Sequence, residues 1–123
     1  MGESRTVHVS HLGGIQASYR LSVPFSHKKP TLVLINSFLT ASALYSPQFS
    51  SHQLTDVLNL LAIEPLGHGK TQLLGSSSFT YWNSAMMNLQ VLDKLGIEKA
   101  YVLGTSQGGW IATRMAVLRP EKV

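Results

Sequence analysis

Segment 104–108 reads G-T-S-Q-G and places Ser106 between two glycines, with an apolar stretch before it and a further glycine, Gly109, after it. This spacing is typical of a serine on a sharp turn between a strand and a helix, where a side chain at either flanking glycine would collide with its neighbours. Such a turn lifts the hydroxyl clear of a sheet and points free helix N–H groups at a developing negative charge. We predict that Ser106 is a catalytic nucleophile. The alternative is an ordinary glycine-containing turn with an incidental serine.

Strands must carry this turn, and five segments have the right pattern. Alternating apolar residues in 6–9 and 17–23, with two glycines between these segments, predict an antiparallel pair of strands. Continuous apolar runs at 31–35, 57–63 and 100–103 predict strands that are covered on both faces.

Helices are predicted between these strands. A short helix is expected within 44–50, and apolar residues three and four apart predict a longer helix over 82–95 that stops at Gly96. A further helix is predicted over 110–118, ended by Pro120. Alternation of strands and helices after an opening hairpin predicts an α/β fold with a mostly parallel sheet and helices on its faces.

Three segments resemble the α/β-hydrolase family: 104–108, 35–40 (I-N-S-F-L-T) and 63–71 (I-E-P-L-G-H-G-K-T). The second is similar to the corresponding loop of 3-oxoadipate enol-lactonases. In this family one oxyanion donor is the N–H of the residue after the nucleophile, which is Gln107 here. Another comes from the loop after the third strand, which points to Phe38. Both residues would act through main-chain groups.

The segment 63–71 also imitates a phosphate-binding loop, because it ends in G-K-T after an apolar strand. The imitation fails at Glu64, where the phosphate-binding pattern needs its first glycine. A serine- and glycine-rich loop also follows Thr71, where a helix would be needed to face the anion. The resemblance instead implies a loop that shapes the backbone beside the active site.

A serine nucleophile needs a base, and the family places the acid and then the histidine after the serine. All five histidines of this chain precede Ser106, and Glu121 is the only carboxylate after it. The resemblance therefore implies that the acid and the histidine lie beyond this chain. His68 is an alternative base, because its loop reaches the same end of the sheet, but the family uses that position structurally.

We expect residues 1–123 to form the N-terminal part of a single α/β-hydrolase domain, with the chain ending before the sixth strand of an incomplete fold. The strand before Ser106 would then lie at an open sheet edge that can pair with another chain. This 123-residue chain alone is expected to be poorly soluble and inactive.

The composition of the chain excludes several other classes of protein. Apolar residues make up 44% of the chain and charged residues 13%, which excludes intrinsic disorder. The absence of cysteine excludes disulfides and thiolate chemistry, and no histidine or carboxylate spacing predicts a metal site. The net charge of +4 comes from scattered residues, so no nucleic-acid partner is expected. We expect no cofactor and no membrane segment.

The resemblance implies a serine hydrolase that acts on an ester, thioester or lactone of a small acyl substrate. A different class stays open, namely a truncated or degenerate relative that only binds a ligand or a partner. Overall likeness to fungal hydrolases of toxin biosynthesis suggests a role in secondary metabolism. A cytoplasmic location is expected, or a peroxisomal one if a C-terminal signal is missing from this chain.

Overall fold

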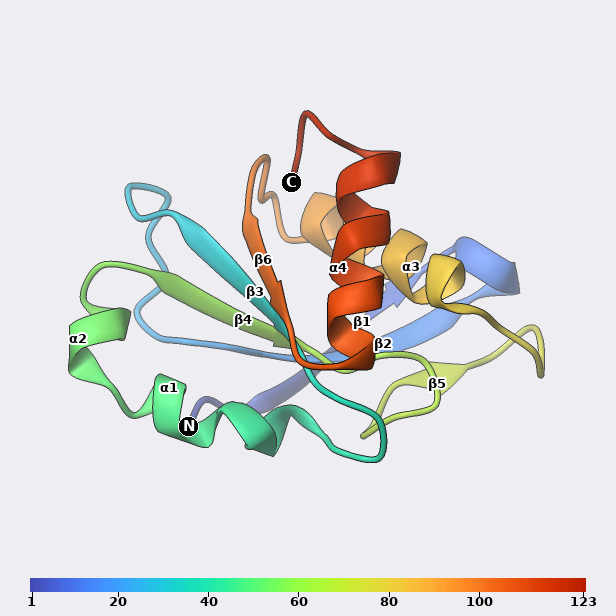
Figure 1. Ribbon diagram of the computed structural model, residues 1–123, viewed down its shortest axis with the longest axis horizontal. Helices are drawn as coiled ribbons and strands as arrows, with labels where there is room; N and C mark the ends of the chain where they lie inside the picture. Colours follow the sequence, from blue (N-terminus) through green and yellow to red (C-terminus); the bar gives the residue numbers. More distant parts are fainter.

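A six-stranded mixed sheet runs through the computed structural model, which describes residues 1–123 (Figure 1). Five strands follow the order β1-β2-β4-β3-β6, and β5 attaches to β2. The strands are β1 (Ser4–Val9), β2 (Ile15–Leu21), β3 (Thr31–Ile35), β4 (Asn59–Ile63), β5 (Gln72–Leu73) and β6 (Tyr101–Gly104). β1 and β2 form the predicted antiparallel hairpin, whereas β4, β3 and β6 are parallel. The predicted α/β fold is thus confirmed, and β6 is the fifth of the predicted strands because the two-residue β5 was not predicted.

Four α-helices and two short 3₁₀ helices connect the strands. They are η1 (His11–Gly13), η2 (Ser42–Tyr45), α1 (Ser46–Phe49), α2 (His52–Thr55), α3 (Tyr81–Lys94) and α4 (Gln107–Leu118). The long predicted helix corresponds to α3, and Gly96, with φ of 71°, follows its end as expected. At the other end of α3, the Thr80 N–H donates to Asn83 Oδ1 at 2.7 Å and satisfies one free donor. None of these helices combines the length and the apolar character that a membrane-spanning helix needs.

The strand predicted over 57–63 begins two residues late, at Asn59. The N–H groups of Val57 and Leu58 both donate to the Leu54 carbonyl, at 3.1 and 2.9 Å, so these two residues close the turn after α2. The Asn59 side chain then donates to the Ser26 carbonyl at 2.8 Å and holds the loop that leads into β3. A local turn and a distant loop therefore decide where this strand starts.

Two apolar cores lie on opposite faces of the sheet. On β3, Val33 and Ile35 face the larger core under α3 and α4, while Leu34 faces the smaller core near α1. This alternation follows from the two-residue period of a strand. Full burial of each such side chain stabilises the fold by about 1.5–3 kcal/mol. Both faces of β3 are therefore covered, as its continuous apolar run predicts.

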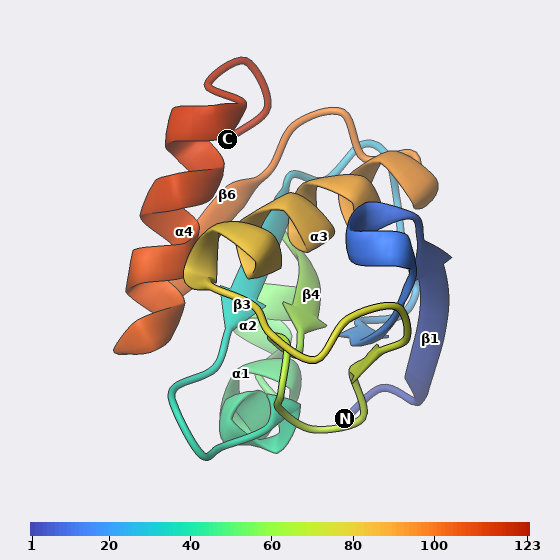
Figure 2. The same ribbon diagram turned by 90° about the vertical axis from the view of Figure 1, so that its right-hand side faces the viewer.

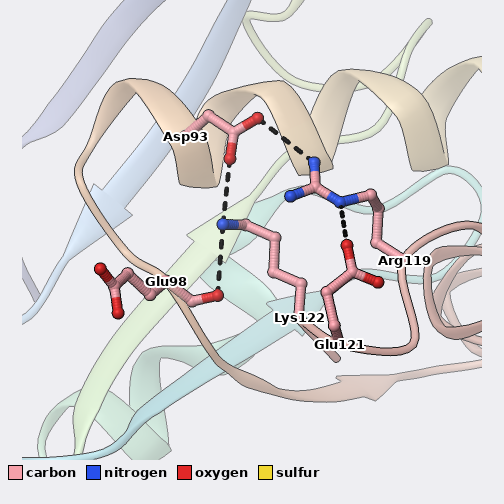
Figure 3. Close-up of polar contacts among 5 residues, drawn as sticks. All are labelled: Asp93, Glu98, Arg119, Glu121 and Lys122. Atoms are coloured by element: carbon pink, nitrogen blue, oxygen red, sulfur yellow. Dashed lines mark hydrogen bonds and ion pairs between the residues drawn. The ribbon is translucent and has the colours of Figure 1, made fainter.

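Ion pairs tie the segment after α4 to the end of α3 (Figure 3). The Lys122 ammonium lies 3.0 Å from Asp93 Oδ1 and donates to the Glu98 carbonyl at 3.3 Å. Arg119 bridges Asp93 at 3.4 Å and Glu121 at 2.6 Å. The hydrogen bond from Lys122 holds the pKa of Asp93 below its usual range.

β6 is paired along one edge only, with β3. Its side chains alternate, so that Val102 packs toward the larger core while Tyr101 and Leu103 are 69% and 47% exposed. Unpaired backbone groups beside exposed apolar side chains form a typical site for strand pairing. The open edge expected from the sequence is present, and what pairs with it stays a prediction.

Candidate active site

Ser106 stands on the turn between β6 and α4, which both views place beside the loop after β3 (Figures 1 and 2). Its backbone angles are φ 54° and ψ −115°, a conformation that costs a non-glycine residue about 1–3 kcal/mol. The side chain is exposed, and its hydroxyl makes no hydrogen bond within the chain. The predicted sharp turn is therefore present, with the hydroxyl free toward solvent.

The glycines around Ser106 allow very close backbone packing. A Cβ at Gly104 would overlap the Gly108 carbonyl carbon, and a Cβ at Gly108 would overlap the Ile35 carbonyl oxygen. At Gly109 the nearest atom would be the Gly104 carbonyl oxygen at 3.5 Å, an ordinary contact. The two glycines of the predicted pattern are thus sterically required, whereas Gly109 is not.

Two of the backbone N–H groups that have no acceptor within the chain belong to the predicted donor residues. One belongs to Gln107, the first residue of α4, where the helix dipole adds positive potential. The other belongs to Phe38, in the loop after β3. This loop is braced by Asn36, whose side-chain amide donates to the Thr40 carbonyl at 2.8 Å. Both groups can donate to a ligand, and their role as oxyanion donors stays a prediction.

Tyr45 supports the turn from the core, a role that no local sequence pattern indicates. Its hydroxyl lies 2.7 Å from the Ile35 carbonyl and 2.7 Å from Thr105 Oγ1. Burial raises the pKa of Tyr45, although its hydrogen bonds to Thr105 oppose that shift. The Thr105 N–H also donates to the Ile35 carbonyl at 3.0 Å. The residue before Ser106 is thereby fixed to β3.

The loop after β4 is organised around the buried carboxylate of Glu64, which is 4% exposed. It accepts the backbone N–H groups of Ser42 at 2.9 Å and Lys70 at 3.0 Å. Burial disfavours the charged carboxylate, but these hydrogen bonds outweigh that effect and hold the pKa of Glu64 below its usual range. The Thr71 hydroxyl donates to the Glu64 carbonyl at 2.7 Å. Glu64, at the start of this loop, is therefore hydrogen-bonded to Lys70 and Thr71 at its end.

This geometry also excludes the phosphate-binding alternative. Gly69 has φ of 54°, and a Cβ there would overlap the Glu64 carboxylate, so the loop folds tightly over an anion of its own. Strand β5, not a helix, follows Thr71. The loop therefore offers no helix N-terminus to a phosphate.

His68 lies on this loop and reaches the turn at Ser106 without contacting its hydroxyl. Its Nδ1 is 3.0 Å from the Leu66 carbonyl, and its Nε2 is 3.2 Å from the side-chain nitrogen of Gln107. Its ring packs edge-on against Phe38, with centroids 5.6 Å apart. Both ring nitrogens have other partners, which argues against His68 as the base for Ser106. No local sequence pattern indicates this contact between His68 and Gln107.

The remaining histidines lie elsewhere. His11 Nε2 is 3.0 Å from the Asn83 side-chain nitrogen, and the His27 ring packs edge-on against Phe25. His8 lies in β1 and His52 begins α2. No three histidine, aspartate or glutamate side chains gather closely enough to hold a metal ion.

A cavity of about 210 Å³ is lined in part by the two predicted donor residues. Its walls include Phe38, Leu66, His68, Phe79, Gln107 and Ile111. A larger cavity of about 1090 Å³ lies at the opposite, amino ends of β3 and β6, away from Ser106. Only the smaller cavity has the predicted donor residues on its wall.

The order and pairing of the strands and the placing of the helices are those of the α/β-hydrolase fold. A model of the family described as alpha/beta hydrolase fold matches residues 30–123, and the chain belongs to this family.

Curated relatives support the same assignment. A protein named as the carbamate hydrolase RutD of Stutzerimonas stutzeri is 30% identical over 103 residues, and 3-oxoadipate enol-lactonase 1 of Acinetobacter baylyi is 26% identical over 122 residues. These matches cover 84% and 99% of this chain, but only 38% and 44% of the relatives. The chain thus spans about two fifths of their length.

Solved structures agree with the fold. A hydrolase of Pseudomonas aeruginosa superposes with a TM-score of 0.81 at 26% identity, over 96% of this chain and 43% of that protein. The N-acyl homoserine lactonase AidH superposes with a TM-score of 0.83 at 24% identity, over 99% of this chain and 42% of that protein.

Proposed function

We propose that this protein hydrolyses carboxylic ester, thioester or lactone bonds with Ser106 as the nucleophile. The observation that carries the proposal is an exposed, unpaired hydroxyl on a strained turn beside the free N–H groups of Gln107 and Phe38. The names of two similar proteins, an enol-lactonase and an N-acyl homoserine lactonase, favour a lactone or a related acyl substrate. We also propose a role in secondary metabolism, which is supported only by the overall sequence likeness to fungal hydrolases of toxin biosynthesis.

In the proposed reaction the Ser106 oxygen forms a bond to the carbonyl carbon as a base removes the hydroxyl proton. The carbonyl electron pair moves to its oxygen, and the N–H groups of Phe38 and Gln107 stabilise the resulting oxyanion. Loss of one such donor costs about 2.7–4 kcal/mol of barrier. The bond to the leaving oxygen or sulfur then breaks, and the leaving group takes the proton from the base. Water repeats the attack, releases the carboxylic acid and restores the serine.

The base and its acidic partner are proposed to come from polypeptide outside these 123 residues. The free edge of β6 is the natural place for that polypeptide to pair, because β6 leads directly to Ser106. Without this addition we expect residues 1–123 to show no turnover. The alternative, a protein that only binds a ligand or partner, would show no reactive serine even when a base is supplied.

Imidazole added to the protein can stand in for the missing base and makes the proposal testable with this chain. We expect a fluorophosphonate probe to label the wild type at Ser106 only when imidazole is present, as read by mass spectrometry. Ser106→Ala should lose the labelling. Ser77→Ala, which changes an exposed serine in the loop before α3, should keep it. Labelling that survives in Ser106→Ala, or no labelling at any imidazole concentration, would contradict the proposal.

A further inference from the structure

One imidazole touches both residues whose N–H groups are proposed to bind the oxyanion. The Nε2 atom of His68 lies 3.2 Å from the Gln107 side-chain nitrogen, and the ring packs against Phe38. Gln107 is only 5% exposed and His68 is half-buried, so this hydrogen bond is partly shielded from water. His68 therefore links the loop after β4 to the loop after β3 and to the start of α4.

The partners of the ring define its protonation state. The Leu66 carbonyl only accepts hydrogen bonds, so the proton must sit on Nδ1 of His68, 3.0 Å away. Nε2 then carries a lone pair and accepts an N–H from the Gln107 amide. The neutral Nδ1–H tautomer satisfies both contacts. A second proton, on Nε2, would face the N–H of the Gln107 side chain. The Gln107 amide would then have to rotate so that its oxygen faced the ring.

The backbone around His68 is itself held firmly. The His68 N–H donates to the Pro65 carbonyl at 3.1 Å, and the Thr71 N–H donates to the His68 carbonyl at 3.2 Å. The same loop is anchored at the buried Glu64 carboxylate through the Lys70 N–H. A continuous set of hydrogen bonds thus leads from the core to Gln107.

We propose that His68 is a positioning residue, which as the neutral Nδ1–H tautomer holds Gln107 and Phe38 so that their N–H groups converge on the oxyanion. This inference rests on the proposed function and deepens it. Oxyanion donors act only within a narrow distance range, and a displacement near 1 Å can lower a rate by about a hundredfold. A side chain that contacts both donor residues is well placed to set that distance.

The tautomer can be tested without any reaction. In the ¹⁵N NMR spectrum of the 123-residue chain, in solution or as sedimented protein, we expect His68 to carry its proton on Nδ1. Gln107→Leu should shift the Nε2 resonance and leave Nδ1 protonated, because the Leu66 carbonyl remains. Gln48→Leu, which changes an exposed glutamine, should shift neither. A proton on Nε2, or an unchanged Nε2 resonance in Gln107→Leu, would overturn the proposal.

The positioning role is tested by His68→Phe, which keeps an aromatic ring against Phe38 but removes both hydrogen bonds. Because imidazole supplies the base, the imidazole-driven labelling rate at Ser106 reports on the donors and not on proton removal. We expect this rate to fall by up to about a hundredfold in His68→Phe and to be unchanged in His52→Phe. A wild-type rate in His68→Phe would overturn the positioning role.

The outcomes separate the two proposals. Loss of all labelling in the wild type would contradict the proposed function, whereas a wild-type rate in His68→Phe would contradict only the positioning role. If His68→Phe does not fold, Gln107→Leu removes the same hydrogen bond from the other side and should slow labelling in the same way. Labelling of the wild type without imidazole, lost in His68→Phe, would identify His68 as the base and also overturn the proposal.

Discussion

Two loops at the same end of the sheet treat their polar groups in opposite ways. The loop after β4, residues 64–71, buries the Glu64 carboxylate and gives it two backbone N–H partners. The turn after β6, residues 104–109, leaves the Ser106 hydroxyl and the Gln107 N–H without partners. Both loops depend on glycines, but one encloses a charge and the other presents a hydroxyl.

This difference indicates that the loop after β4 serves the stability of the fold, whereas the turn after β6 serves reactivity. A buried charge is tolerated only when hydrogen bonds replace its water, so the loop after β4 acts as a fixed support. The unpaired Ser106 hydroxyl costs little because its residue is exposed to solvent, whereas the unpaired N–H belongs to Gln107, which is only 5% exposed. His68, the residue through which the first loop touches the second, transmits the fixed position of one to the other.

The largest effect on the free energy of unfolding is expected where the turn at Ser106 packs against β3. Gly108→Ala would drive a methyl group into the Ile35 carbonyl, so we expect the free energy of unfolding to fall by more than about 3 kcal/mol in urea denaturation. Gly109→Ala, one residue further along α4, should raise stability by up to about 1 kcal/mol, because alanine favours the helix and meets no clash. Equal effects at the two positions would contradict the close approach of the turn to β3.

A smaller loss of stability is expected when the loop after β4 loses the charge of Glu64. Glu64→Gln replaces one carboxylate oxygen with an NH₂ group, which cannot accept, so the N–H group of either Ser42 or Lys70 loses its partner. We expect a loss of about 1–3 kcal/mol, measured by urea denaturation at neutral pH. Glu98→Gln, which changes an exposed glutamate, should stay close to the wild type. A neutral Glu64→Gln variant would show that the buried carboxylate is not required.

The pH dependence of stability sharpens the same contrast. The pKa of Glu64 is lower in the folded chain than its usual value near 4.3, so its stabilising effect is present above that value. This effect is lost as the pH falls through the folded-state pKa. We expect melting temperatures measured from pH 7 to pH 3 to fall less steeply in Glu64→Gln than in the wild type. Parallel curves would show that Glu64 ionises normally.

Local patterns were sufficient for the hairpin, β3 and α3, because alternation, apolar runs and helical spacing are carried by neighbouring residues. The turn at Ser106 was also predictable, since its glycines are required by contacts with the adjacent strand and helix. The two-residue strand β5 and the four-residue helix α2 were not predicted. Such short elements are held by their surroundings and carry little periodicity of their own.

The site was less predictable than the fold, because its contacts join residues that are far apart in sequence. The hydrogen bond between His68 and Gln107 spans 39 positions, and the bond between Tyr45 and Thr105 spans 60. No spacing rule indicates such pairs. The candidate donor Phe38 came from the family resemblance, and the structure adds that its N–H is unpaired.

The smallest change in stability is expected when the backbone strain at Ser106 is relieved. Glycine adopts positive φ without cost, so Ser106→Gly should relieve part of the strain, although it also increases the entropy of the unfolded chain. We expect a net gain of about 1 kcal/mol in urea denaturation. Ser106→Ala keeps the Cβ atom and the strain while it removes the hydroxyl, so its stability should match the wild type. If Ser106→Ala gains as much as Ser106→Gly, the hydroxyl and not the backbone is the destabilising group, and the strained turn would no longer explain how this loop differs from its neighbour.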